Sequence, residues 1–162
     1  MTLPTLTDVR NRTDVAIAPL LAERWSPRGF DADHQIDRDD LHSIVTALAG
    51  FNQAWTPAAS ALIVFAAVPE RAGKMAAWVD YDLGQAAAHA TMQVEYLGLR
   101  AHQMGGFKPD AIREAFNLPA GVVPKTVMAV GQFDTSADVA PEIRQRDTAE
   151  RGRLPLTDLL IR

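Results

Sequence analysis

The chain has 162 residues, 48% of them hydrophobic and 22% charged, which is the composition of one ordinary globular domain. We therefore expect a single domain that spans residues 1–162. The formal net charge of -4 argues against a global positive field that would attract nucleic acid or an anionic membrane. The absence of cysteine excludes disulfides, thiolate metal sites and a thiol nucleophile, but not redox chemistry that needs no thiol.

Hydropathy along the chain bears on localisation. Charged side chains such as Asp8, Arg12 and Glu23 interrupt residues 1–30, so the sequence shows no apolar core of a secretory signal there. The most apolar run, residues 58–68, is too short to cross a membrane as a helix. We therefore predict a cytoplasmic protein.

The first half of the chain predicts two helices followed by a strand. A proline can start a helix over residues 19–24, because its missing N–H costs nothing in the first turn. Residues 37–48 predict a second helix, with an N-cap aspartate at its start and Gly50 after its end. Residues 61–67 are apolar on both faces, which predicts a strand in the interior of a sheet, and residues 69–73 predict a loop.

The second half predicts a long central helix and two further strands. Residues 82–97 keep one apolar, alanine-rich face over about four turns, and Gly98 ends this helix. The remaining predicted elements are a strand over residues 99–104, a short helix over 109–116, a strand over 126–130 and a short helix over 141–146.

The C-terminal segment Leu154–Ile161 is more apolar than a chain end exposed to water. It could pack on its own domain, or it could exchange with a second copy and bury two tails in one dimer. Together with the alanine-rich helix face, which permits close approach, this segment predicts a homodimer.

No motif assigns a catalytic side chain or a metal ligand. The four histidines show no paired spacing that would place two imidazoles on one helical face. The sequence also lacks the G-x-S-x-G turn of serine hydrolases and the G-x-x-x-x-G-K-[ST] phosphate loop. We therefore predict no metal site, and neither hydrolase nor nucleoside triphosphatase activity.

Two arginine clusters could bind an anion. In Arg24-Trp25-Ser26-Pro27-Arg28, two guanidinium groups and a hydroxyl stand at alternate positions, from which they can converge on phosphate oxygens. Arg151 and Arg153 form a second alternate pair, with Arg144 and Arg146 upstream. Either cluster could instead be a set of solvated surface arginines, so the anion hypothesis requires that the fold bring the two together.

Gly105 and Gly106 join the strand predicted over residues 99–104 to the following short helix. Without side chains, their backbone amides can come close to a flat ligand, and a helix N-terminus nearby favours electron-rich atoms. The same pair is also compatible with a tight turn that binds nothing.

Taken together, these segments resemble the FMN-dependent nitroreductase family. The resemblance covers most of the chain in the family's order, and the ordered set is more specific than any one piece. Its parts are E-R-W-S-P-R-x-F-D at residues 23–31, N-Q-A-W at 52–55, Y-D-L-G-Q-A at 81–86, H-Q-M-G-G-F at 102–107, A-I-R-E-A-F-N-L-P at 111–119, V-M-A-V-G at 127–131 and R-G-R-L-P-L at 151–156.

The resemblance implies an α+β fold, in which a mixed or antiparallel sheet is flanked by helices and two subunits intertwine as a homodimer. It implies one FMN per active site, lying in the subunit interface. The implied activity is a ping-pong cycle in which NAD(P)H gives a hydride to FMN and a nitroaromatic, quinone or similar small acceptor then takes the electrons.

The resemblance also implies which residues would bind FMN. The first arginine cluster and its serine would contact the phosphate, ribityl or pyrimidine end, and the second arginine pair would complete the phosphate site. The glycine pair would offer amides near the reactive ring nitrogen. The residues so implied are Arg24, Ser26, Arg28, Gly105, Gly106, Arg151 and Arg153.

The chain is short for this family. A segment like S-x-N-x-Q-P-W, with a strand and helix after it, is absent beyond residues 37–48, which we interpret as an internal deletion of one strand and its flanking helices. The deletion would leave the strand over residues 61–67 at an edge of the sheet and remove polar side chains expected against the flavin. The alternative function is therefore a non-catalytic relative that binds or stores flavin weakly, or a dimeric structural module that has lost FMN.

Overall fold

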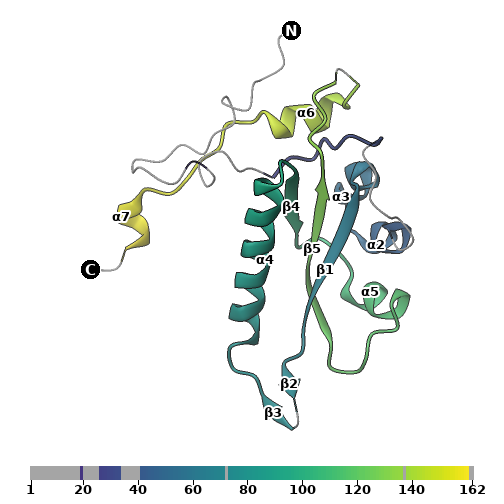
Figure 1. Cartoon of the computed structure of the whole chain (residues 1–162), viewed down its shortest axis with the longest axis vertical. Helices are drawn as coiled ribbons and strands as arrows, with labels where there is room; N and C mark the ends of the chain where they lie inside the picture. The colour runs from purple at the N-terminus through teal and green to yellow at the C-terminus, as the bar shows by residue number, and fades with distance from the viewer. Residues whose placement is uncertain (1–18, 20–25, 34–40, 72, 137, 161–162) are drawn as a thin grey trace.

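The computed structural model describes residues 19, 26–33, 41–71, 73–136 and 138–160. Within them, an antiparallel sheet carries helices on both faces (Figure 1). The sheet has the strand order β1-β5-β4, and β5 pairs antiparallel with both neighbours. Its strands are β1 (Ala61–Ala67), β4 (Arg100–Met104) and β5 (Val123–Gly131). This architecture confirms the predicted α+β fold with an antiparallel sheet.

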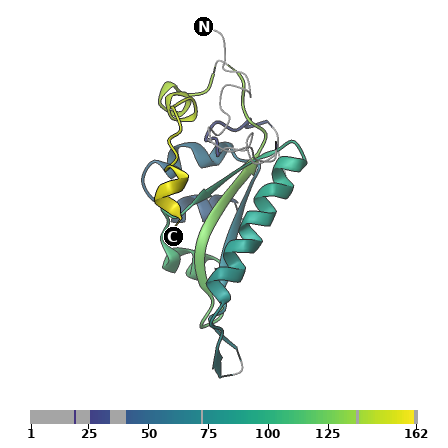
Figure 2. The ribbon, with the colours of Figure 1, turned by 90° about the vertical axis from the view of Figure 1, so that its left-hand side faces the viewer.

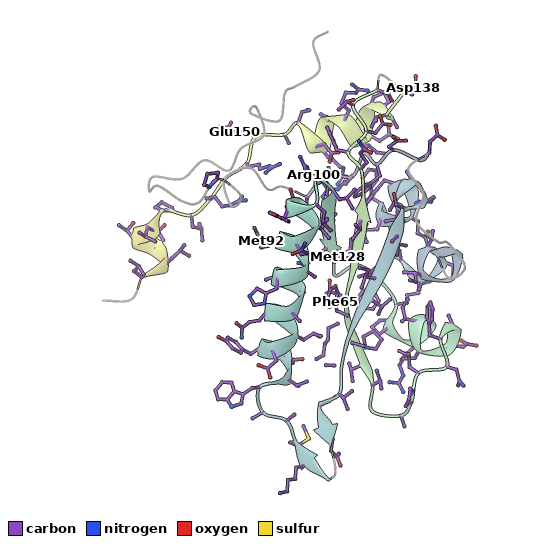
Figure 3. All side chains as sticks on the ribbon, in the orientation of Figure 1. Phe65, Met92, Arg100, Met128, Asp138 and Glu150 are labelled. Carbon is purple, nitrogen blue, oxygen red and sulfur yellow. The ribbon has the colours of Figure 1, made fainter. Side chains whose placement is uncertain are left out.

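The central strand β5 is buried on both faces. Val127 and Ala129 pack into the main core on one side, while Met128 and Val130 pack on the other side under α4 (Val79–Tyr96). The alternation follows from the two-residue period of a strand. Figure 3 shows Met128 on the side of the sheet that α4 covers.

Short helices cover the face of the sheet opposite α4 (Figure 2). They are α2 (Leu41–Ala47), α3 (Asn52–Trp55) and α5 (Pro109–Ala115), and a 3-10 turn over Thr56–Ala58 follows α3. The core between these helices and the sheet contains the fully buried side chains of Leu48, Trp55 and Ile112.

The helix predicted over residues 82–97 begins one turn earlier, and part of its apolar face lies on the chain's own sheet. Ala87 and Thr91 are buried there, with Ala90 and Val94 beside them. Part of the alanine-rich face therefore lies on the chain's own sheet, whereas Ala86 and Leu97 on the same predicted face are exposed. Gly98 ends the helix as predicted, at a φ of +77° that favours glycine.

Among the residues that the structure describes, β1 lies at an edge of the sheet, whereas its apolar pattern predicted an interior position. Both of its faces are nevertheless partly covered, since Leu62 and Val64 pack against the main core and Phe65 packs on the α4 side, while Ile63 is 41% exposed. The apolar pattern therefore predicts that side chains on the faces of the strand pack against other elements, but it does not predict whether both edges of the strand are paired.

Three other predictions differ from the structure or lie outside it. The loop predicted over residues 69–73 is instead a hairpin of β2 (Glu70–Arg71) and β3 (Lys74–Met75) that projects from the end of the sheet (Figure 1). The N-Q-A-W segment forms α3, a helix that the sequence did not predict. The helix over residues 19–24 and the N-cap at residue 37 lie outside the described residues, apart from residue 19.

The chain beyond α6 (Pro141–Asp147) leaves the body of the domain, and α7 (Leu156–Leu159) stands apart from α4 in Figure 1. Leu154 and Leu159 are 67% and 59% exposed, so the described part of the tail does not pack on its own domain. Among the described residues, no helix combines the length and apolarity needed to cross a membrane.

Candidate functional site

Residues 26–31 run along the end of the sheet and are attached to the chain that continues from β5. The Asp31 N–H donates to the carbonyl of Gln132 at 2.9 Å. Gly131 permits this close approach, because a Cβ atom there would lie 2.7 Å from the Phe30 ring. The segment that carries Ser26 and Arg28 is therefore fixed against the sheet.

A buried carboxylate ties the same segment to the end of α6. Asp147 is 6% exposed and accepts hydrogen bonds from the N–H of Arg28, at 2.8 and 2.9 Å to its two oxygens, and of Gly29 at 2.8 Å. The Arg28 guanidinium lies 3.7 Å from the carboxylate. Burial raises the pKa of Asp147, while the N–H donors of Gly29 and Arg28 and the nearby positive charges oppose that rise.

His102, on β4, holds the segment from the other side. Its Nδ1 lies 2.8 Å from the carbonyl oxygen of Ser26 and 3.0 Å from that of Pro27, and its ring packs at 4.8 Å from that of Trp55. Carbonyl oxygens only accept, so we assign the proton to Nδ1. Burial, and then the positive charge of Arg28, lower the pKa of His102 to about 4, so the imidazole is neutral at pH 7.

Four arginines meet beside these contacts in a cavity of about 270 Å³, which we call the arginine pocket. The pocket contains four guanidinium groups and two carboxylates, so its lining carries a formal excess of two positive charges. Figure 3 shows Glu150 on the segment that continues from α6. The pocket is lined by Ser26, Arg28, His102, Arg146, Asp147, Ala149, Glu150, Arg151 and Arg153. This composition favours an anion.

A second contact fixes Arg146. Its guanidinium carbon lies 4.1 Å from the centre of the Phe51 ring, a cation–π arrangement that links α6 to the start of α3. A larger hollow of about 400 Å³ lies on the other side of Arg28, but its lining is mainly apolar and holds a single arginine. The arginine pocket is therefore the better candidate for an anionic ligand.

Gly105 and Gly106 follow β4 directly and are exposed. The Gly106 carbonyl is held by the N–H of Ala49 at 2.9 Å and by the Asn52 side-chain amide at 3.3 Å, whereas its N–H makes no backbone hydrogen bond within the described part of the chain. A Cβ atom on Gly105 would meet nothing within 4 Å. The turn therefore presents open backbone that a flat ligand could approach.

Comparison with known proteins finds one relative in sequence and several solved structures with the same fold. No family model matches the sequence. A Mycolicibacterium smegmatis protein, described as an uncharacterized 15.4 kDa protein in the ask 5′ region, is 34% identical over 137 residues, which make up 85% of this chain and 89% of that protein. The crystal structure of an oxidoreductase containing FMN matches with a TM-score of 0.84 and 25% identity, over 93% of each chain.

Two solved structures described as nitroreductase family proteins also match. The one from Streptococcus pneumoniae has a TM-score of 0.69 and 12% identity, over 88% of this chain and 98% of its own. The one from Clostridium difficile has a TM-score of 0.55 and 24% identity, over 85% and 92%. The chain belongs to the same family as the Mycolicibacterium smegmatis protein, and its fold is that of the nitroreductase family proteins.

Most of the predicted cofactor residues of this nitroreductase-like protein meet in the arginine pocket. Arg24 lies outside the described residues. Gly105 and Gly106 are not in the pocket lining but lie three and four residues beyond His102, with Gly105 at roughly 10 Å for the rise of a strand. The residues that the pocket does bring together are Ser26, Arg28, Arg151 and Arg153.

Five pocket residues were not predicted as site residues: His102, Arg146, Asp147, Ala149 and Glu150. His102 stood in one of the family-like motifs, and Arg146 stood next to the second arginine pair. Asp147 carries another signal, since a carboxylate in the last turn of a helix opposes the helix dipole and needs compensating contacts. Arg144, by contrast, points elsewhere, because its guanidinium donates to the Ser136 carbonyl at 2.8 Å.

Proposed function

We propose that this protein is an FMN-dependent NAD(P)H oxidoreductase that reduces nitroaromatics, quinones or similar small acceptors. The observation that carries the proposal is the arginine pocket, where residues from opposite ends of the chain converge on one anion site. The similarity to an oxidoreductase containing FMN supports the same cofactor here.

The charge of the pocket fits the phosphate of FMN. A phosphate monoester carries a charge of about -1.5 to -2 near pH 7. The formal excess of two positive charges in the pocket balances that charge. Arg28, Arg151 and Arg153 would hold the phosphate oxygens, and the Ser26 hydroxyl would add a neutral donor.

The separation along β4 between the arginine pocket and the glycine pair suits the ribityl chain and ring of FMN. The ribityl chain would run from the arginine pocket past His102, and the flavin ring would lie against the open backbone of Gly105 and Gly106. FMN bound in this way would supply two-electron transfer between NAD(P)H and the acceptor. The chain itself contributes binding, orientation and backbone donors beside the ring.

We also propose that the protein acts as a homodimer. Leu154, Leu159 and Leu160 are each more than half exposed on a tail that leaves the domain. Burial of these side chains against a second copy would remove the apolar surface from water. The flavin ring would then lie in the interface, where the partner shields it.

The phosphate assignment is tested by comparing FMN with riboflavin, which lacks the phosphate. A hydrogen bond to a charged group contributes about 1.5–3 kcal/mol, so Arg28→Ala and Arg153→Ala should each weaken FMN binding about ten- to a hundredfold. Riboflavin binding should change little. Arg144→Ala is the matched control, since this arginine lies outside the pocket.

The redox assignment needs a separate measurement. NADH or NADPH should bleach the visible absorbance of the FMN-loaded protein, and a quinone or nitroaromatic should restore it. Equal affinity of wild type for FMN and riboflavin would refute the phosphate site. FMN binding without bleaching would favour the non-catalytic alternative.

A further inference from the structure

His102 presents an acceptor to a pocket that otherwise consists mainly of donors. His102 lines the arginine pocket and its Nδ1 is occupied by the carbonyls of Ser26 and Pro27, so Nε2 is the ring nitrogen left to bind a ligand there. With the proton on Nδ1, Nε2 has a free lone pair and no hydrogen to donate. The group that binds there must therefore be a donor.

We propose that Nε2 of His102 accepts a hydrogen bond from a ribityl hydroxyl of the bound flavin. The inference rests on the proposed function and extends it to a residue that would recognise the ribityl chain of the flavin. Phosphate oxygens of the dianion accept hydrogen bonds and would be repelled by this lone pair, whereas hydroxyl groups donate. His102 thus complements the arginines, which bind the phosphate.

The position of His102 agrees with this role. It lines the arginine pocket and stands three residues before Gly105 on the same strand, between the proposed phosphate and ring sites. Its side chain is 7% exposed and its ring packs against Trp55, so the imidazole is held in one orientation. A fixed acceptor costs little conformational entropy when the ligand binds.

Two substitutions of His102 distinguish the role of its Nδ1 from the role of its Nε2. His102→Asn places an amide near the position of Nδ1, where it can still donate to the carbonyls of Ser26 and Pro27, but removes the acceptor at Nε2. His102→Gln places an amide near the position of Nε2 and can supply an acceptor there. The ligands are FMN, riboflavin and lumiflavin, whose ring carries a methyl group in place of the ribityl chain.

We expect His102→Asn to weaken FMN and riboflavin by the same factor, about two- to tenfold, and to leave lumiflavin unchanged. His102→Gln should recover part of the loss. Thermal unfolding of both variants establishes that they are folded during the titrations. Recovery by Gln, together with an unchanged lumiflavin affinity, supports the hydroxyl contact.

The other outcomes overturn it. A loss confined to FMN would place His102 on the phosphate, and a loss that includes lumiflavin would make its role structural. Unchanged affinities in His102→Asn would refute the contact while leaving the proposed function intact. Wild type that binds none of the three flavins would refute both proposals.

Discussion

Replacing Asp147 by alanine should destabilise the domain and weaken the arginine pocket together. The carboxylate accepts three hydrogen-bond contacts from the backbone N–H groups of Arg28 and Gly29, and it lies beside the Arg28 guanidinium. Removing it leaves two buried or partly buried N–H groups without an acceptor, at about 1–3 kcal/mol each. We expect the free energy of unfolding to fall by about 2–4 kcal/mol.

Asp147→Asn gives an intermediate case. One amide oxygen can take the place of Oδ2, which accepts from both Arg28 and Gly29, but the amide nitrogen cannot accept at the other position. We expect about half of the loss seen with alanine. Glu142→Ala is the matched control, since Glu142 is an exposed carboxylate on the same helix and should change stability by about 0.5 kcal/mol or less.

Urea unfolding followed by tryptophan fluorescence measures these differences, and the denaturant slope should stay constant. For a chain of this length, the alanine variant should also melt roughly 5–15 °C below wild type. FMN affinity should fall with it, because Arg28 loses the contact that orients it. If Asp147→Ala unfolds within 0.5 kcal/mol of Glu142→Ala, the carboxylate does not hold the two segments together.

Three further predictions follow from the described contacts. The pKa of His102 is lowered from 6.5 to about 4 in the folded protein, so between these pH values the unfolded chain binds a proton that the folded protein does not, and stability falls with the pH. Wild type should therefore lose about 2 kcal/mol more stability than His102→Asn between pH 7 and pH 5, measured by urea unfolding, and an equal loss would contradict the assignment. Gly105→Val should weaken FMN and riboflavin alike while leaving the melting temperature unchanged, because its side chain enters open space over the turn. Leu156→Asp with Leu159→Asp should convert the homodimer to monomers in light scattering, whereas a wild type that is already monomeric would refute the dimer.

Local sequence patterns determined most of the secondary structure. The helix over residues 82–97, the strand over 61–67 and the turn at Gly98 were all readable, because spacing and glycine conformation depend on near neighbours in the chain. The ordered motifs also predicted the nitroreductase-like fold and four of the residues that line the arginine pocket.

Packing between distant segments decided what those patterns could not. The apolar run of β1 does not distinguish a central strand from an edge strand, since the packing of its faces says nothing about the pairing of its edges. The apolar face of α4 could cover a partner or its own sheet, and only the tertiary structure shows that part of it covers the sheet.

The site depends most on long-range contacts. Nothing near Asp147 in sequence indicates that it accepts hydrogen bonds from Arg28 and Gly29, which lie more than 100 positions earlier. Likewise, the proton on Nδ1 of His102 follows from carbonyl oxygens on another segment. The sequence determines which residue types are available, but hydrogen-bond partners, burial and protonation depend on which segments folding brings together.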